Sequence, residues 1–386
     1  MRFATRRTTI ITLAMKTYGS PQLGARIKRA RTKLDLSQDD LALKLGFNDR
    51  QTVSDIETGK RALKAEELLA LSDALEQEVQ YFLDPFSVAG EAEYCWRAGP
   101  SLPQAELDRF EERASRWVGL LRWLRNEHKL SSTPLKLTLP LTSSSSFERA
   151  EFFAEQLVAK YDLGPIPAAK LVDFMETALD TPVLFVDTGE VQESGAISGA
   201  ACDLGTLGVV LVNRNEPATR RNFDLAHELF HTLTWPSMKP DHRESNSVLD
   251  RKGAHRIEQL ANCFAAALLM PTSSLDAFID PGMAGDVNHL VEVAGRLRVS
   301  VEALSWRLYR LGRIDRRTRE ALAAVRAIAS NELPPKPFSH SFVAMLHTAL
   351  DRGWLTARKA ASAMGMTLGE LKGLFLTHEI ASPFDL

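Results

Sequence analysis

The chain lacks the features that several large classes of protein require. Its 386 residues include only three cysteines, Cys95, Cys202 and Cys263, which lie far apart and form no C-x-x-C pair. This odd number at such spacing argues against a disulfide-stapled secreted fold and a zinc ribbon, and it favours a reducing, cytoplasmic setting. No apolar run approaches the roughly 18 residues needed to cross a bilayer, so we expect no membrane segment.

Neither sign of charge dominates the whole chain, because 47 Lys and Arg stand against 49 Asp and Glu. With 45% hydrophobic residues, this composition is that of a globular protein, and the length predicts two or three domains. The first 33 residues are the exception, with nine Lys or Arg and no Asp or Glu. Such a block is typical of a nucleic-acid-facing segment, and equally of a solvated tail. We expect residues 1–21 to be a basic disordered extension.

Residues 22–84 predict a compact bundle of short helices. Apolar side chains recur at three- and four-residue steps over residues 23–34, which indicates one helix. Ser37, with Asp40 three residues later, is a suitable N-cap for a second helix. A third helix is predicted over residues 50–57, with most of its polar side chains left outside. In a helix-turn-helix, the polar start of such a helix enters the major groove.

Two strings carry a family resemblance here. S-Q-x-x-L-A-x-x-x-G, followed by T-V-S-D-I-E-T-G-K-R, closely resembles the Cro/phage-repressor (XRE) helix-turn-helix family over about 60 residues. Asp55 and Glu57 leave the third helix poorly electropositive, so phosphate attraction must come from residues 26–33 and from Lys60 and Arg61. We therefore expect weak binding by one copy and a homodimer on a two-fold operator in double-stranded DNA. A helical bundle with a merely polar face is the alternative. The side chains expected to contact DNA are Gln38, Gln51, Thr52, Ser54, Asp55 and Lys60.

The chain then divides at polar and proline-rich stretches. Residues 94–130 predict a spacer helix, and residues 131–147 and 331–338 have the composition of linkers. Residues 338–386 predict a helical C-terminal module for interaction or dimerisation. The part between the linkers, residues 147–330, carries the chemistry.

The strongest chemical signal is the pentapeptide H-E-L-F-H at residues 227–231. A helix is predicted around it, with Pro217 in its first turn and a stop at residues 235–236. Residues four apart share one face of a helix, so His227 and His231 can bind one tetrahedral metal ion. Glu228 would then lie beside the open position and accept a proton from a metal-bound water that attacks a peptide carbonyl. The alternative is two histidines satisfied within the fold and a surface glutamate.

A catalytic zinc site needs a third protein ligand. The metzincin continuation is excluded, because Thr234 and Ser237 stand where that class has Gly and His. A second helix is predicted over residues 254–270, with Glu258 and Asn262 four apart. Glu258 can coordinate the metal, and Asn262 can hold the far ring nitrogen of a ligand histidine.

Two other histidines compete less well for the metal. His255 lies only three residues before Glu258, at or before the start of the predicted helix. His242 lies in a polar stretch, residues 237–252, that we expect to form a loop over the cleft.

The strings F-D-L-A-H-E-L-F-H and I-E-Q-L-A-N-C-F-A-A-A-L-L-M-P look like the ImmA/IrrE family of metallopeptidases, over roughly residues 147–315. The resemblance implies a compact zinc endopeptidase that cuts DNA-binding repressors, with a small sheet whose edge strand aligns the substrate. It implies Zn²⁺ ligation by His227, His231 and Glu258, and Glu228 as general base. Strands are expected at residues 183–186, 196–201 and 207–212, with 196–201 as the edge.

Together these patterns predict an α+β, mostly helical protein. An all-α helix-turn-helix domain precedes a zincin-like peptidase domain with a small sheet, and a helical module follows. The expected function is that of a DNA-binding zinc metalloendopeptidase that regulates gene expression, as in a stress response, by cleaving a repressor protein or itself. The alternative is a transcription regulator whose metal-binding domain senses a ligand or partner without proteolysis.

Overall fold

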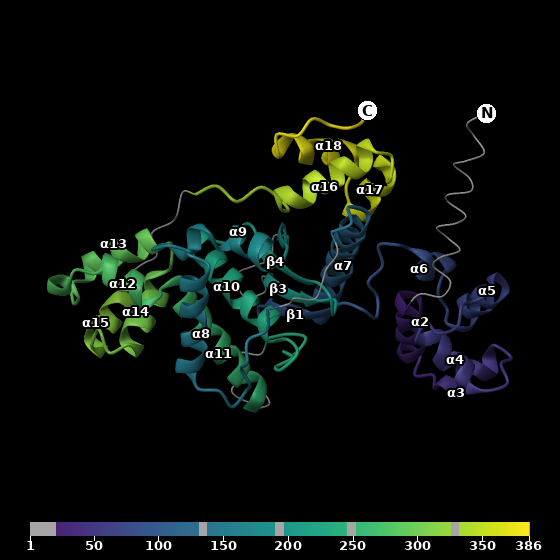
Figure 1. Ribbon diagram of the computed structural model, residues 1–386, viewed down its shortest axis with the longest axis horizontal. Helices are drawn as coiled ribbons and strands as arrows, with labels where there is room; N and C mark the ends of the chain where they lie inside the picture. Colours follow the sequence, from purple (N-terminus) through teal and green to yellow (C-terminus); the bar gives the residue numbers. More distant parts are fainter. Residues whose placement is uncertain (1–20, 131–136, 190–196, 245–251, 326–331, 386) are drawn as a thin grey trace.

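The computed structural model describes residues 21–130, 137–189, 197–244, 252–325 and 332–385. Nearly all of the expected N-terminal extension lies outside these residues, as does Ala196. The described chain is mostly helical with one four-stranded sheet, as the sequence predicts (Figure 1). Within it, no helix is both long and apolar enough to span a bilayer.

The N-terminal bundle has a small core of its own, built from residues 23–82. Ser37 begins the second helix with a reciprocal capping box to Asp40, which confirms the predicted cap. Asp49 caps the third helix, and the bounds of that helix are those predicted. The helices are α2 (Pro21–Lys33), α3 (Gln38–Lys44), α4 (Arg50–Glu57), α5 (Ala65–Ala74) and α6 (Val79–Leu83).

The sheet has the order β1-β3-β4-β2, with β2 parallel to β4 and the other pairs antiparallel. Two expectations are wrong here. Residues 94–98, expected to be helical, belong to a strand. Residues 196–201 were expected at the edge, but β3 lies in the interior between β1 and β4. The strands are β1 (Glu93–Ala98), β2 (Val183–Val186), β3 (Ile197–Asp203) and β4 (Gly208–Asn213).

Helices cover both faces of this sheet. Side chains alternate along each strand, so Tyr94 and Trp96 point to one face while Cys95 and Arg97 point to the other. The Trp96 face packs against α7 (Gln104–Glu127) and against helices from the C-terminal end of the chain. Figure 1 shows those C-terminal helices, in yellow, beside α7. They are α16 (His340–Asp351), α17 (Ala357–Met364) and α18 (Leu368–Thr377).

The other face of the sheet packs against α10 (Ala218–Thr234), which begins directly after Pro217 and ends at Trp235. Next to α10 lies α11 (Lys252–Leu269), which in turn packs against α8 (Phe147–Lys160). Short elements and a helical extension complete this half: η1 (Pro167–Ala169), α9 (Leu171–Asp173), η2 (Phe174–Ala178), α12 (Thr272–Phe278), η4 (Pro281–Met283), α13 (Val287–Leu297), α14 (Val301–Arg310) and α15 (Arg316–Ala323).

The described parts of the two expected linkers are packed segments. Leu139 and Leu141 are buried, and the Leu139 amide donates to the Leu233 carbonyl at 2.9 Å. The Phe338 amide donates to the Phe185 carbonyl at 2.7 Å, beside β2. These apolar side chains are spaced among prolines and serines, so the composition of the two segments does not indicate that they are buried.

Candidate metal centre

Two neighbouring helices place histidine and glutamate side chains in one buried cluster. His227 and His231 lie one turn apart on the inner face of α10 and are almost fully buried. Glu258 lies on α11, which packs along α10. The Glu258 Oε2 atom is 3.1 Å from His227 Nε2 and 3.6 Å from His231 Nε2. The two Nε2 atoms are themselves 3.1 Å apart.

A fourth donor completes the cluster, and it is one that the sequence patterns did not single out. Glu244, in the segment after α10, brings its Oε1 atom to 3.2 Å from His227 Nε2. One donor atom from each of His227, His231, Glu244 and Glu258 lies within 4.8 Å of the others. The sequence offered only a weak signal for this residue, an acid in a polar stretch without periodicity.

These distances fit a tetrahedral ion. With zinc–ligand bonds of about 2.0–2.1 Å, neighbouring donors in a tetrahedron lie about 3.3 Å apart. The donor set of two imidazole nitrogens and two carboxylate oxygens is one that zinc accepts. The separations of 3.1–3.6 Å given above are close to this value, so the donor atoms of this cluster fit a zinc ion.

The two competing histidines lie outside this cluster. His255 places its Nε2 atom 3.0 Å from Gln259 Nε2. His242 is about half exposed and pairs with Glu111 at 2.5 Å. Neither belongs to the group of four that the structure brings together within its described residues.

A hydrogen-bonding group contacts the far side of the His227 ring. Asn262 Oδ1 lies 3.1 Å from His227 Nδ1, on the side of the ring away from the cluster. A partner at that position holds the imidazole in the orientation that presents Nε2 to the metal. His231 Nδ1 is buried and has no hydrogen-bond partner among the described residues.

Glu228 is fully buried beside this cluster, and neither of its carboxylate oxygens has a hydrogen-bond partner in the described structure. Burial, reinforced by the nearby Glu244 carboxylate, raises the pKa of Glu228 well above its ordinary value. A Cβ added at Gly199 of β3 would lie 3.8 Å from Glu228 Cγ, so the carboxylate lies under the middle of the sheet. A buried carboxyl group without partners is costly, which points to a functional role.

The charges around the cluster favour a bound cation. Burial and the Arg97 cation both act to lower the pKa of His227, but the Glu244 and Glu258 carboxylates outweigh them and raise it to about 10. Burial acts to raise the pKa of Glu258, yet the two histidines hold it well below its ordinary value. Without a metal, the carboxylates must keep a proton on the imidazole. A divalent ion would replace that proton.

A cleft of about 790 Å³ opens beside the metal centre. Asn262 and Asp224 line it on the side of the metal ligands, and Arg97 pairs there with Asp224 at 3.1 Å. Phe223 and Trp306 supply apolar lining. The cleft reaches the cluster through Asn262 and Arg97, and none of the four donor residues lines it.

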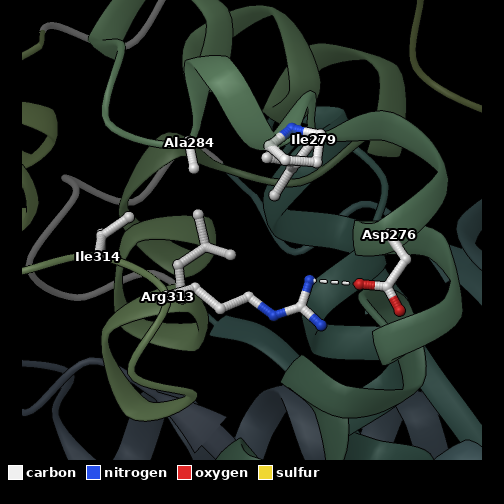
Figure 2. Close-up of a pocket in the computed structure, with 7 residues that line it drawn as sticks. Asp276, Ile279, Ala284, Arg313 and Ile314 are labelled. Carbon is white, nitrogen blue, oxygen red and sulfur yellow. Dashed lines mark ion pairs between the residues drawn. The ribbon is translucent and has the colours of Figure 1, made fainter.

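A smaller pocket, of about 360 Å³, lies between the helices of the extension (Figure 2). Arg313 and Asp276 form an ion pair across it at 2.7 Å. None of the four metal-centre residues lines this pocket.

The residues expected to contact DNA lie on α3, on α4 and just after α4. Gln51 is exposed, and its amide donates to Asp55 Oδ1 at 2.8 Å. Thr52 and Ser54 are half-buried, whereas Lys60 is exposed. Gln38 donates to Glu57 Oε2 at 2.9 Å, so its amide is held against α4.

Only some of the cations expected to attract phosphate in residues 26–33 are free to do so. Arg26 is buried and donates to the Phe82 and Ser87 carbonyls. Arg31 is buried in a bidentate pair with Glu57. The exposed cations of this stretch are Lys28, Arg29 and Lys33.

Two family models match separate parts of the chain. Residues 27–82 match the helix-turn-helix family model, and residues 190–309 match the peptidase M78 model, described as the IrrE N-terminal-like domain. No curated protein matches the chain.

Among solved structures, the chain is similar to the competence regulator ComR from Streptococcus vestibularis in complex with its cognate signaling peptide XIP. The identity is 13%, over 89% of this chain and 98% of that one, and the TM-score of 0.15 is too low to support any argument. The family models, together with the fold, show that this protein joins an N-terminal helix-turn-helix domain of the XRE type to an M78 peptidase domain of the IrrE N-terminal-like type.

Proposed function

We propose that this protein is a DNA-binding zinc metalloendopeptidase that regulates gene expression by cutting a DNA-binding repressor protein, or itself, at a specific site. The observation that carries the proposal is the geometry of the metal centre. His227, His231 and Glu258 converge within 3.6 Å of one another, with the unpaired carboxyl group of Glu228 buried beside them.

The residues of the chain have distinct tasks in this proposal. His227, His231 and Glu258 hold the zinc ion, and Asn262 orients the His227 ring from behind. When bound, zinc polarises the scissile carbonyl and makes water a better nucleophile at neutral pH. Glu228 takes the proton from the attacking water and passes it to the leaving amine nitrogen. Its raised pKa suits it to hold that proton between the two steps.

In this proposal the helix-turn-helix domain determines where on the DNA the peptidase domain acts. It brings the peptidase domain to an operator, where DNA-bound repressors are concentrated. Binding at an operator also couples cleavage to the control of particular genes. We expect the protein to bind as a homodimer, because only a few exposed cations remain on the DNA-binding face.

One observation favours a second candidate, a regulator that binds metal but cuts nothing. Glu244 offers a fourth donor atom beside His227, His231 and Glu258, and a metal site closed by four protein ligands is typical of a structural zinc. Against this candidate stands Glu228, since a structural site has no use for a buried carboxylate base beside it.

The test is comparative proteolysis. We expect wild-type protein, incubated with total cell protein, to generate new peptide termini in a DNA-binding repressor or in itself. Glu228→Gln should retain the zinc content measured by elemental analysis and lose this cleavage by at least a hundredfold. Glu292→Gln, an exposed change on α13, is the matched control and should cut normally. Equal cleavage by Glu228→Gln would remove Glu228 as the base, and no new termini from any sample would favour the non-proteolytic regulator.

A further inference from the structure

We infer that residues 242–244 are an internal occupant of the peptidase site. Their backbone fills the free edge of β1, where a substrate strand would add, and Glu244 acts as a fourth protein ligand to the metal. The inference rests on the proposed function and deepens it, because it states the form in which the peptidase is held before a substrate arrives.

The backbone of the segment pairs with the outer edge of the sheet. One side of β1 is hydrogen bonded to β3, and the other side is the edge. On that outer side, the Trp96 amide donates to the His242 carbonyl at 2.9 Å, and the Glu244 amide donates to the Trp96 carbonyl at 2.9 Å. Trp96 and Arg243 thus form a parallel bridge. An extended peptide that docks on a sheet uses these same edge groups, so it must compete with the segment.

The side chains of His242 and Arg243, which directly precede Glu244, hold the segment in this register. Arg243 donates to the Leu102 carbonyl at 3.0 Å and also to the Gly99 carbonyl. His242 pairs with Glu111 of α7. Because these contacts reach the start of α7 and the turn before it, they fix the segment to the part of the chain that carries β1.

The register places the Glu244 carboxylate in the metal centre. Its side chain is only 7% exposed, with Oε1 at 3.2 Å from His227 Nε2. Oε2 lies 3.7 Å from Arg97, which projects from β1 on the same face of the sheet. One donor atom from each of Glu244, His227, His231 and Glu258 lies within 4.8 Å of the others, so in this inference Glu244 would take the coordination position that water or a peptide carbonyl needs. A substrate that adds to β1 therefore has to remove the backbone pairing and the carboxylate together.

Metal binding tests the inference directly. We expect Glu244→Ala to bind Zn²⁺ at least tenfold more weakly than wild type in a chelator competition, because one of four ligands is lost. With Co²⁺ in place of zinc, the visible spectrum of wild type should not change on adding azide, since the protein fills every position. The spectrum of Glu244→Ala should shift, since azide can enter the vacated one.

A second variant keeps Glu244 and removes contacts that hold its segment in place. Arg243→Ala removes the contacts to the Leu102 and Gly99 carbonyls, and we expect its Co²⁺ spectrum to respond to azide more than that of wild type. Both variants should cut a substrate severalfold faster than wild type. Glu292→Gln is the control for all measurements, and a thermal scan shows whether each variant is folded.

The outcomes separate this inference from the proposed function. If Glu244→Ala and wild type bind zinc equally tightly and both respond to azide, the inference is wrong and the zinc peptidase stands. If the variant binds as expected but neither protein cleaves anything, Glu244 is a ligand of a non-proteolytic metal site, and the pairing with β1 does not guard a substrate site. If wild type binds no zinc, both proposals fail.

Discussion

Some basic residues of α2 hold the helix-turn-helix domain together, and others remain exposed. Arg26 and Arg31 are buried and tie α2 to α6 and α4, whereas Lys28, Arg29 and Lys33 remain exposed. A charge count cannot separate these groups, because it does not show that Arg26 and Arg31 are buried and hydrogen bonded within the domain, away from a phosphate. The DNA affinity should therefore depend on fewer cations than the nine basic residues of the first 33 suggest.

In the proposed function, recognition of the operator sequence depends on single side chains of α4. We expect Gln51→Ala with Ser54→Ala to relax operator preference, since amide and hydroxyl groups discriminate bases by about 1–3 kcal/mol for each good contact. Gel-shift titrations on operator and scrambled DNA measure this as converging affinities. Lys60→Ala is the control and should weaken binding to both DNAs alike. A uniform loss in the double variant would instead assign Gln51 and Ser54 to phosphate contacts.

Two glycines inside helices have very different surroundings. In α7, a Cβ at Gly119 would lie 1.6 Å from the Phe86 carbonyl oxygen, so only glycine allows this close approach. In α18, a Cβ at Gly373 would meet nothing within 4 Å. The two positions cannot be distinguished by their local sequence, because both lie inside a helix.

This difference predicts opposite effects on the free energy of unfolding. Gly119→Ala should destabilise by about 1–3 kcal/mol or more, because backbone must move to relieve the overlap. Gly373→Ala should stabilise by about 0.4–1 kcal/mol, because alanine loses less conformational entropy in a helix. Urea unfolding followed by circular dichroism measures both. Stabilisation by Gly119→Ala would show that α7 does not approach Phe86 as described.

The strand β1 shows why a short strand is difficult to predict from sequence patterns. Its six residues alternate correctly, with Tyr94, Trp96 and Ala98 on one face, but they directly precede a 24-residue helix whose periodicity dominates the region. The strand is defined by its pairing with β3, about a hundred residues away along the chain. Because β1 is also an edge strand of the sheet, local patterns could not reveal the edge that residues 242–244 fill, where we propose that a substrate strand adds.

At the scale of the whole molecule, the C-terminal helices are part of the peptidase half. Leu184 and Val186 of β2 share one buried cluster with α7 and with α16, α17 and α18. Trp117 of α7 donates from its ring nitrogen to the Met364 carbonyl at 3.1 Å. The helix-turn-helix domain, in contrast, has a core formed only from its own residues.

Truncation should therefore have unequal effects. Removal of residues 338–386 uncovers the part of one sheet face that α7 does not cover, and we expect aggregation or loss of a cooperative thermal transition, with loss of zinc binding. Removal of residues 1–83 should leave a folded protein that binds zinc as the full chain does. Calorimetry and elemental analysis of the two truncated chains test this. A stable, metal-binding chain without residues 338–386 would make those helices an independent module after all.

The features that could be predicted from the amino-acid sequence depend on neighbours along the chain: the capped helices, the face shared by His227 and His231, and the third-ligand candidate Glu258 on a predicted helix. Helical periodicity and capping are local properties, so they can be recognised without a structure. The strand order, the burial of Arg26 and Arg31, and the approach of Glu244 to His227 could be seen only in the folded chain. Each of these depends on contacts between segments that are distant in sequence, and no local pattern specifies which distant groups will meet.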